Sequence, residues 1–83
     1  MSTDNLTTIP GVGPRIAEKL RRLGIHQVSD LKDRDPEHLY LDYNHLVGRQ
    51  ADRCLLYVFR CAVYFAETQN PQEGKLKWWN WKD

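Results

Sequence analysis

The sequence is poor in the features of membrane-spanning and exported proteins. No apolar run approaches the roughly 20 residues needed to cross a bilayer, and residues 1–6 are polar where a secretory signal needs an apolar segment. The only cysteines, Cys54 and Cys61, are expected in one helix with their Cα atoms about 10 Å apart. That exceeds the roughly 7 Å limit of a disulfide, so both thiols are expected to be reduced. These absences favour a cytoplasmic protein without a membrane partner.

Charge of one sign is also scarce, since the net charge is +1 at pH 7. The basic residues are nevertheless gathered in one part of the chain. Residues 1–26 carry four basic against two acidic side chains, or +2, whereas residues 27–46 carry two against five, or −3. A polyanion would therefore approach the first segment and avoid the second. A length of 83 residues, with 41% hydrophobic, predicts one globular domain over residues 1–83.

Glycine and proline divide the first half of the chain into short expected helices. The first contains Leu6 and Ile9. The second begins at Pro14, a residue favoured at the first helical position, and ends before Gly24, which suits a left-handed cap. A third, short turn of helix contains Leu31.

The second half is expected to hold two longer helices and a tail. One helix begins with an Asp35 cap followed by Pro36 and ends at Gly48. The other spans residues 49–67 and is expected to be the central core helix, with Asp52 near its start accepting backbone amides or pairing with Arg49 or Arg53. The expected core-facing residues are Leu39, Tyr43 and Leu46, then Cys54, Val58, Cys61 and Phe65 with Leu55, Phe59, Ala62 and Ala66.

The first two helices and their connection resemble the helix-hairpin-helix family. The matching residues over 6–23 follow the pattern Leu6-x-x-Ile9-Pro10-Gly11-Val12-Gly13-x-x-x-Ala17-x-x-Leu20. The resemblance implies an all-α, SAM-domain-like fold of five helices in which a second hairpin follows the first. Residues 46–50, with the sequence LVGRQ, lie where that second unit falls, but a single glycine makes it degenerate.

The glycine-bounded turn of the first hairpin suits the binding of an anion. Successive backbone N–H groups there point into a concavity beside the positive end of the next helix. Glycine leaves no Cβ to block a phosphate oxygen, and such contacts hold DNA without reading its bases. The expected phosphate-binding residues are Gly11, Val12, Gly13, Arg15, Ile16, Lys19 and Arg22. The alternative is a turn that only packs two helices.

The degenerate hairpin and the long helix offer further candidates. A second DNA contact would comprise Gly48, Arg49, Arg53 and Arg60, unless this hairpin is purely structural. One face of the long helix alternates Arg53, Tyr57, Arg60 and Tyr64, which suits nucleic-acid stacking, a protein interface or the rim of a core.

The tail, residues 75–83, contains all three tryptophans. In water they would expose more apolar area than a small domain tolerates, so we expect the tail to pack back onto the helices. Base stacking or a partner groove is the alternative. The Arg/Tyr face and the tail together define an alternative function, that of a protein-interaction adaptor.

No catalytic site, cofactor motif or small-molecule site is evident, and we expect a non-enzymatic protein without a cofactor. His38, Asp42 and His45 lie at the i, i+4 and i+7 positions of one expected helix, as metal ligands sometimes do. A fourth ligand is not apparent, and surface histidines explain the spacing equally well. Buried cysteines are usually inert, which is the expectation for Cys54 and Cys61.

Two bacterial families resemble longer parts of the chain. Residues 52–66, DRCLLYVFRCAVYFA, together with the Trp-rich end, look like the pathogenicity-locus proteins, which are often described as mitomycin-resistance proteins. This resemblance covers nearly the whole chain and implies a fold and a bacterial source but no reaction. The first half also resembles the C-terminal domain of a competence-regulator family through Gly-Val-Gly-Pro, Leu-Gly-Ile and Asp30-Leu31. Weak, sequence-independent DNA binding is the expected function.

Overall fold

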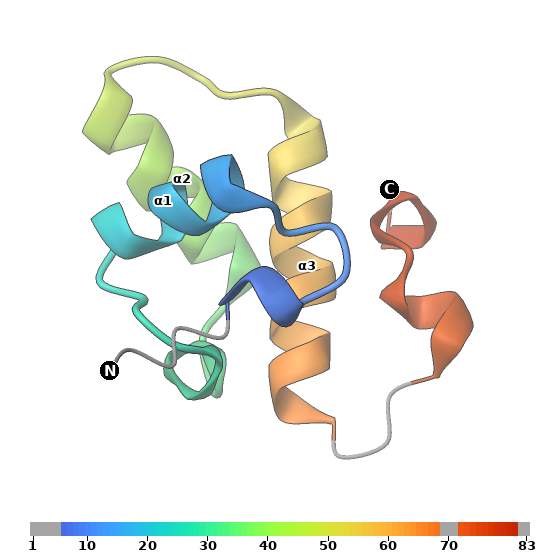
Figure 1. Cartoon of the computed structure of the whole chain (residues 1–83). Helices are drawn as coiled ribbons and strands as arrows, with labels where there is room; N and C mark the ends of the chain where they lie inside the picture. The colour runs from blue at the N-terminus through green and yellow to red at the C-terminus, as the bar shows by residue number, and fades with distance from the viewer. Residues whose placement is uncertain (1–5, 69–71, 82–83) are drawn as a thin grey trace.

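A computed structural model describes residues 6–68 and 72–81, and every regular element over these residues is helical (Figure 1). The α-helices are α1 (Pro14–Arg22), α2 (Pro36–Val47) and α3 (Arg53–Glu67). Short 3₁₀-helices accompany them: η1 (Leu6–Thr8), η2 (Val28–Leu31), η3 (Glu73–Leu76) and η4 (Trp78–Trp81). The all-α prediction is confirmed. The first and third expected helices are single 3₁₀ turns, which is common for short connecting segments.

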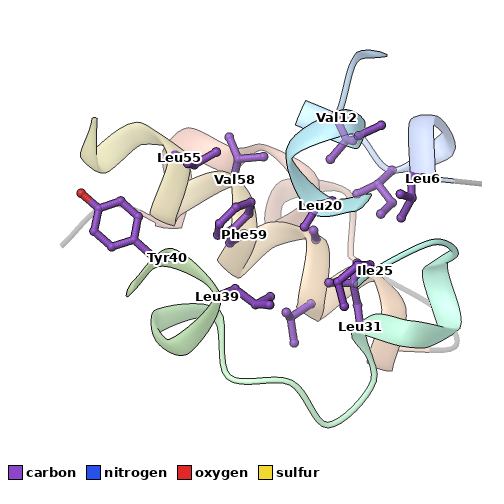
Figure 2. Packing of buried hydrophobic residues seen from close by; sticks show 14 of the residues in the cluster. Leu6, Val12, Leu20, Ile25, Leu31, Leu39, Tyr40, Leu55, Val58 and Phe59 are labelled. Carbon is purple, nitrogen blue, oxygen red and sulfur yellow. The ribbon is translucent and has the colours of Figure 1, made fainter. Parts of the chain in front are cut away.

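Helix α3 lies between two layers, with α1 and α2 on one side and the C-terminal segment, residues 72–81, on the other (Figure 1). Its buried residues are Leu55, Leu56, Val58, Phe59, Cys61, Ala62, Val63 and Ala66. Phe59 is the largest fully buried side chain and shares one cluster with Leu20 of α1 and Leu39 of α2 (Figure 2). The prediction that this helix is central to the core is confirmed.

The start of the long helix was expected at residue 49 but lies at Arg53. Gly48 ends α2 in the left-handed conformation, with φ of 73°. The loop that follows is held by α2, because Asn44 Oδ1 accepts the Ala51 N–H at 2.7 Å and the Tyr40 hydroxyl donates to the Ala51 carbonyl. These contacts hold residues 49–52 outside the helix.

The other helix ends follow the capping signals of the sequence. The Asp35 carboxylate accepts the Glu37 N–H at 2.9 Å, so the predicted start of α2 is confirmed. After α1, Gly24 has φ of 89° and the Ile25 N–H donates to the Leu20 carbonyl at 2.9 Å. This is a Schellman motif, in which the apolar Ile25 and Leu20 are both fully buried.

Two residues expected in the core, Leu46 and Cys54, are exposed, and a third, Phe65, packs at the edge of the core. Leu46 is 51% exposed although it shares a helix face with the buried Leu39, because it lies in the last turn of α2, beyond the buried residues Leu39, Tyr40 and Tyr43. Phe65 is only half-buried. Cys54 is exposed, whereas Cys61 is buried, because a second layer covers it: its Sγ lies 3.7 Å from the Lys75 carbonyl and 4.0 Å from the Pro10 carbonyl.

The C-terminal segment packs back onto α3, as predicted for the tail. The centres of the Trp81 and Tyr64 rings are 5.5 Å apart, and the Trp81 indole N–H donates to the Lys75 carbonyl at 2.7 Å. Arg60 holds the segment in place, because its guanidinium donates to the Trp81 carbonyl at 2.7 Å and to Glu37 of α2 at 2.9 Å. The last two tail residues, Lys82 and Asp83, lie outside the described residues.

None of the helices within residues 6–68 and 72–81 is both long enough and apolar enough to span a bilayer.

Deleting residues 75–83 is expected to lower the melting temperature by at least about 10 °C. The deletion loses the stabilisation that comes from burying each large aromatic, about 1.5–3 kcal/mol for a fully buried ring, and 1 kcal/mol moves the melting temperature of a domain this size by about 4–8 °C. Differential scanning calorimetry measures the shift. Trp79→Ala, which removes a ring that is 50% exposed, should give a much smaller shift. An unchanged melting temperature after the deletion would contradict the packing.

The two thiols are expected to differ in reactivity. A thiol-alkylating reagent should modify exposed Cys54 first, because burial raises the pKa of the Cys61 thiol and the thiolate is the reactive form. Peptide mass spectrometry over time measures both rates, and in denaturant they should converge. Equal rates in the folded protein would rule out the burial of Cys61.

Candidate functional site

The glycine turn, residues 11–13, connects η1 to α1. Gly11 has φ of 87°, in the left-handed region that favours glycine. Val12 is buried and its N–H donates to the Ile9 carbonyl at 3.0 Å, which anchors the turn to the core. Gly13 is extended, with φ of −93° and ψ of −173°, and occupies the N-cap position before Pro14. Of the two glycines, only Gly11 therefore uses the positive φ that the sequence permits at both.

The start of α1 has backbone donors without acceptors. The first bond inside the helix runs from the Ala17 N–H to the Gly13 carbonyl at 2.9 Å. Within the described part of the chain, the N–H groups of Gly11, Gly13, Arg15 and Ile16 donate to no other group. The first turn of α1 has no acidic residue, and its N-cap provides no side-chain acceptor. These donors and the positive end of the helix dipole favour a negatively charged group.

One side of the glycine turn is covered and the other is open. A Cβ built on Gly11 would lie 3.1 Å from Cδ1 of Trp78, so the tail contacts the turn at this glycine. A Cβ built on Gly13 would have no heavy atom within 4 Å. Both glycines are exposed. An anion therefore has access to the turn from the Gly13 side.

The predicted basic residues of α1 differ in exposure. Arg15 and Arg22 are exposed, and their spacing of seven residues places them on one face of the helix. Lys19 lies between them on the same face but is half-buried, with Nζ 5.5 Å from the centre of the Tyr43 ring. Ile16 is half-buried and packs against the core cluster. Two exposed guanidinium groups and one partly covered ammonium therefore follow the open side of the turn.

Residues from the two expected contacts meet in one groove. A cavity of about 460 Å³ lies between α1 and residues 49–52, and both Lys19 and Arg49 line it. Gly48 and Arg49 are exposed at the end of α2. Arg53 is exposed at the start of α3, with its guanidinium 6.0 Å from the centre of the Tyr57 ring. Lys19 of α1 and the degenerate hairpin, residues 46–50, thus contribute to the same groove.

Arg60 differs from the other candidates for the second contact. Its guanidinium is bonded to Glu37 and to the Trp81 carbonyl and lies 5.6 Å from the Tyr57 ring. Tyr64, on the same helix face, accepts the Gln72 N–H at 2.9 Å and packs on Trp81. Half of the Arg/Tyr face is therefore covered by the C-terminal segment.

Asp52 caps α3, one of the alternatives expected from the sequence. Its carboxylate accepts the Cys54 N–H at 2.9 Å, and hydrogen bonding to Cys54 lowers the pKa of Asp52. The predicted group of His38, Asp42 and His45 is exposed along α2. Among residues 6–68 and 72–81, no three His, Cys, Asp or Glu side chains are grouped as metal ligands would be.

The contact of Trp78 with Gly11 had no signal in the sequence, because it joins residues far apart in the chain. The same holds for the link between α2 and the loop at Ala51. Turn composition and helix periodicity describe only neighbours within a few residues. Aromatic content alone pointed to a buried tail without identifying the surface that buries it.

Comparison with known proteins establishes the relationship of the chain. The model of the family described as "Pathogenicity locus" matches residues 1–83. The chain belongs to this family. A relative named "Mitomycin resistance protein McrB", from Streptomyces lavendulae, is 35% identical over 77 residues, which cover 93% of this chain and 70% of the relative. No solved structure matches the chain significantly. The pathogenicity-locus resemblance seen in residues 52–66 and the Trp-rich end is thereby confirmed.

Asp52→Asn is expected to reduce stability at neutral pH more than in acid. Because the folded-state pKa of Asp52 lies below its unfolded value, the ionised carboxylate stabilises the fold above pH of about 4, and this contribution is lost as the pH falls through the folded-state pKa. Urea unfolding of the unmodified protein and of Asp52→Asn between about pH 2 and pH 7 measures the difference between their free energies of unfolding. Asp42→Asn on α2 corrects for the change in net charge. If this difference in free energy were constant over the whole pH range, capping by the ionised Asp52 carboxylate would be unimportant.

Proposed function

We propose that the protein is a helix-hairpin-helix domain that binds the phosphate backbone of DNA without reading its sequence and carries out no reaction. In this interpretation η1, the glycine turn and α1 form the first hairpin. Helices α2 and α3 with residues 48–52 form the degenerate second hairpin, and η2 connects the two. The five elements follow the order of the five-helix, SAM-domain-like arrangement expected from the sequence.

The observation that carries the proposal is the difference between the helix starts. Asp35 and Asp52 each supply a carboxylate to the first turn of their helices, α2 and α3. The first turn of α1 begins instead at Gly13, which has no side chain to accept its N–H groups. The chain therefore leaves open the one α-helix start that lies beside a glycine turn and is followed by basic residues. Phosphate supplies the missing acceptors.

The distribution of cations supports a polyanion as the ligand. Arg15 and Arg22 are exposed along the face of α1 that follows the turn. Lys19 and Arg49 line the adjoining groove with one carboxylate, Asp52, which is bonded to the Cys54 N–H. We include Gly48, Arg49 and Arg53 in the proposed second contact. Arg60 is left out, because its guanidinium is already bonded to Glu37 and to the Trp81 carbonyl.

The alternative function, a protein-interaction adaptor, depends on the Arg/Tyr face and the Trp-rich tail. Arg60 and Tyr64 contribute to that face, but both contact the C-terminal segment of the same chain. The face left for a partner is thereby reduced to Arg53 and Tyr57 at the start of α3. The open donors of the glycine turn also have no role in this alternative. DNA binding accounts for more of the observed geometry.

Gly13→Glu tests the proposal with little risk to the fold. Any residue tolerates the extended backbone at Gly13, and its Cβ would have no neighbour within 4 Å. The added carboxylate would compete with phosphate for the same N–H groups. A charge-assisted hydrogen bond is worth about 1.5–3 kcal/mol, so affinity for a short duplex should fall at least about tenfold. Fluorescence anisotropy at low salt measures it, and for the unmodified protein the log–log salt slope should be about −2 to −3.

Two matched variants separate the turn from general charge effects. Gly13→Ala keeps the donors open and should retain most of the affinity. Ser29→Glu adds the same charge at an exposed position of η2 and should reduce affinity only slightly. Unchanged DNA affinity in Gly13→Glu, or equal losses in Gly13→Glu and Ser29→Glu, would refute binding through the turn. The adaptor function would then be the better account.

A further inference from the structure

The glycine turn adjoins an aromatic pair in the C-terminal segment. Trp78 is half-buried, packs against the core cluster and contacts Gly11. Trp79 meets it edge to face, with ring centres 5.8 Å apart and an interplanar angle of 85°. The aromatic surface on the Gly11 side of the turn therefore consists of the Trp78 ring, which packs on the turn, and the Trp79 ring, which packs on Trp78.

Trp79 differs from the other two tryptophans in having few contacts. Trp78 lies against the turn, and Trp81 stacks near Tyr64 and donates to the Lys75 carbonyl. The Trp79 side chain is 50% exposed, and within the described part of the chain its indole N–H has no acceptor. An exposed indole is costly in a domain of marginal stability. Its edge-to-face contact with Trp78 nevertheless holds the ring in a defined position.

We propose that Trp79 is a base-stacking residue and that the protein prefers DNA with an unpaired base beside the bound phosphate, such as a single-stranded overhang, over an uninterrupted duplex. The inference rests on the proposed function, because the glycine turn supplies the phosphate contact. To sequence-independent phosphate binding it adds a preference for one class of DNA, that with an unpaired base. The partner is one strand that places a phosphate on the turn and an adjacent base on the indole.

The class of DNA follows from the chemistry of an exposed indole. In an uninterrupted duplex both faces of each base are covered by neighbouring bases, so a side chain that offers a ring face gains little there. An unpaired base has a free face, and stacking on an aromatic side chain favours it without regard to sequence. The charge of the segment agrees with a DNA strand, because Lys77 is exposed next to the aromatic pair in the sequence. A stacking residue and a sequence-independent phosphate site are compatible in one surface.

The test compares two DNA probes of equal length and charge, a blunt hairpin duplex and a duplex with a short single-stranded overhang that contains 2-aminopurine. The full chain should bind the overhang probe more tightly and quench the 2-aminopurine fluorescence. Stacking of one base corresponds to an affinity ratio of about 5- to 150-fold. Trp79→Ala should abolish that ratio while affinity for the blunt duplex is retained, and Trp79→Phe should restore most of it.

Leu41→Ala is the matched control, because Leu41 is 52% exposed but lies on α2. It should leave both affinities unchanged. A preference for the overhang that survives Trp79→Ala, or equal affinity of the unmodified protein for both probes, would overturn the stacking role of Trp79. In that case blunt-duplex binding that is lost in Gly13→Glu would leave the proposed function standing. Absence of binding to either probe at low salt would overturn both.

Discussion

The structure depends on the burial of α3 from two sides. Helices α1 and α2 cover one side and the C-terminal segment covers the other (Figure 1), so eight of the 15 residues of α3 are buried. A domain of this size cannot form two cores, and one helix that serves both layers solves this problem. Arg60 links the layers, because a single guanidinium contacts Glu37 of α2 and the Trp81 carbonyl. Breaking that link would affect both layers.

The same arrangement fixes the position of the glycine turn. Val12 anchors the turn in the core, and Trp78 lies against Gly11 from the opposite layer. The turn is therefore held between two packed elements, and its donors need no rearrangement before an anion binds. Binding sites that are ordered in advance lose less conformational entropy when they are occupied. In the proposed function, a turn held in place by Val12 and Trp78 would offset the small number of charges available for binding DNA.

Local signals in the sequence predicted where the helices begin and end better than they predicted which helices contact each other. The Asp35 cap, the left-handed cap at Gly24 and the helix end at Gly48 each act within a few residues, and the structure confirms them. For Asp52 the structure shows capping, one of the expected alternatives. The start of α3 was wrong by four residues, because Asn44 and Tyr40 hold Ala51 in a loop. The sequence pattern at Gly48 could not show this.

Burial was predicted from helical periodicity. This prediction was wrong where burial depends on a second layer of the structure. Cys54 and Cys61 lie on one stripe of α3, but the C-terminal segment reaches only Cys61. Helical spacing identifies which residues share a face and does not show how far along the helix that face is covered. The candidate site has the same limitation. The glycines and cations were identifiable by type, whereas the contact of Trp78 with Gly11 and the groove that Lys19 and Arg49 both line required the folded chain.

The C-terminal segment links stability to the candidate site. Trp78 and Trp81 are engaged in packing, and their burial offsets part of the free-energy cost of leaving Trp79 exposed. A segment present only for stability would be expected to bury its third ring as well, since the exposed indole adds apolar surface in water. Packing alone therefore accounts for two of the tryptophans. The third packs on Trp78, the ring that contacts the glycine turn, and this position is better explained by the proposed ligand, which presents both an anion and an aromatic face.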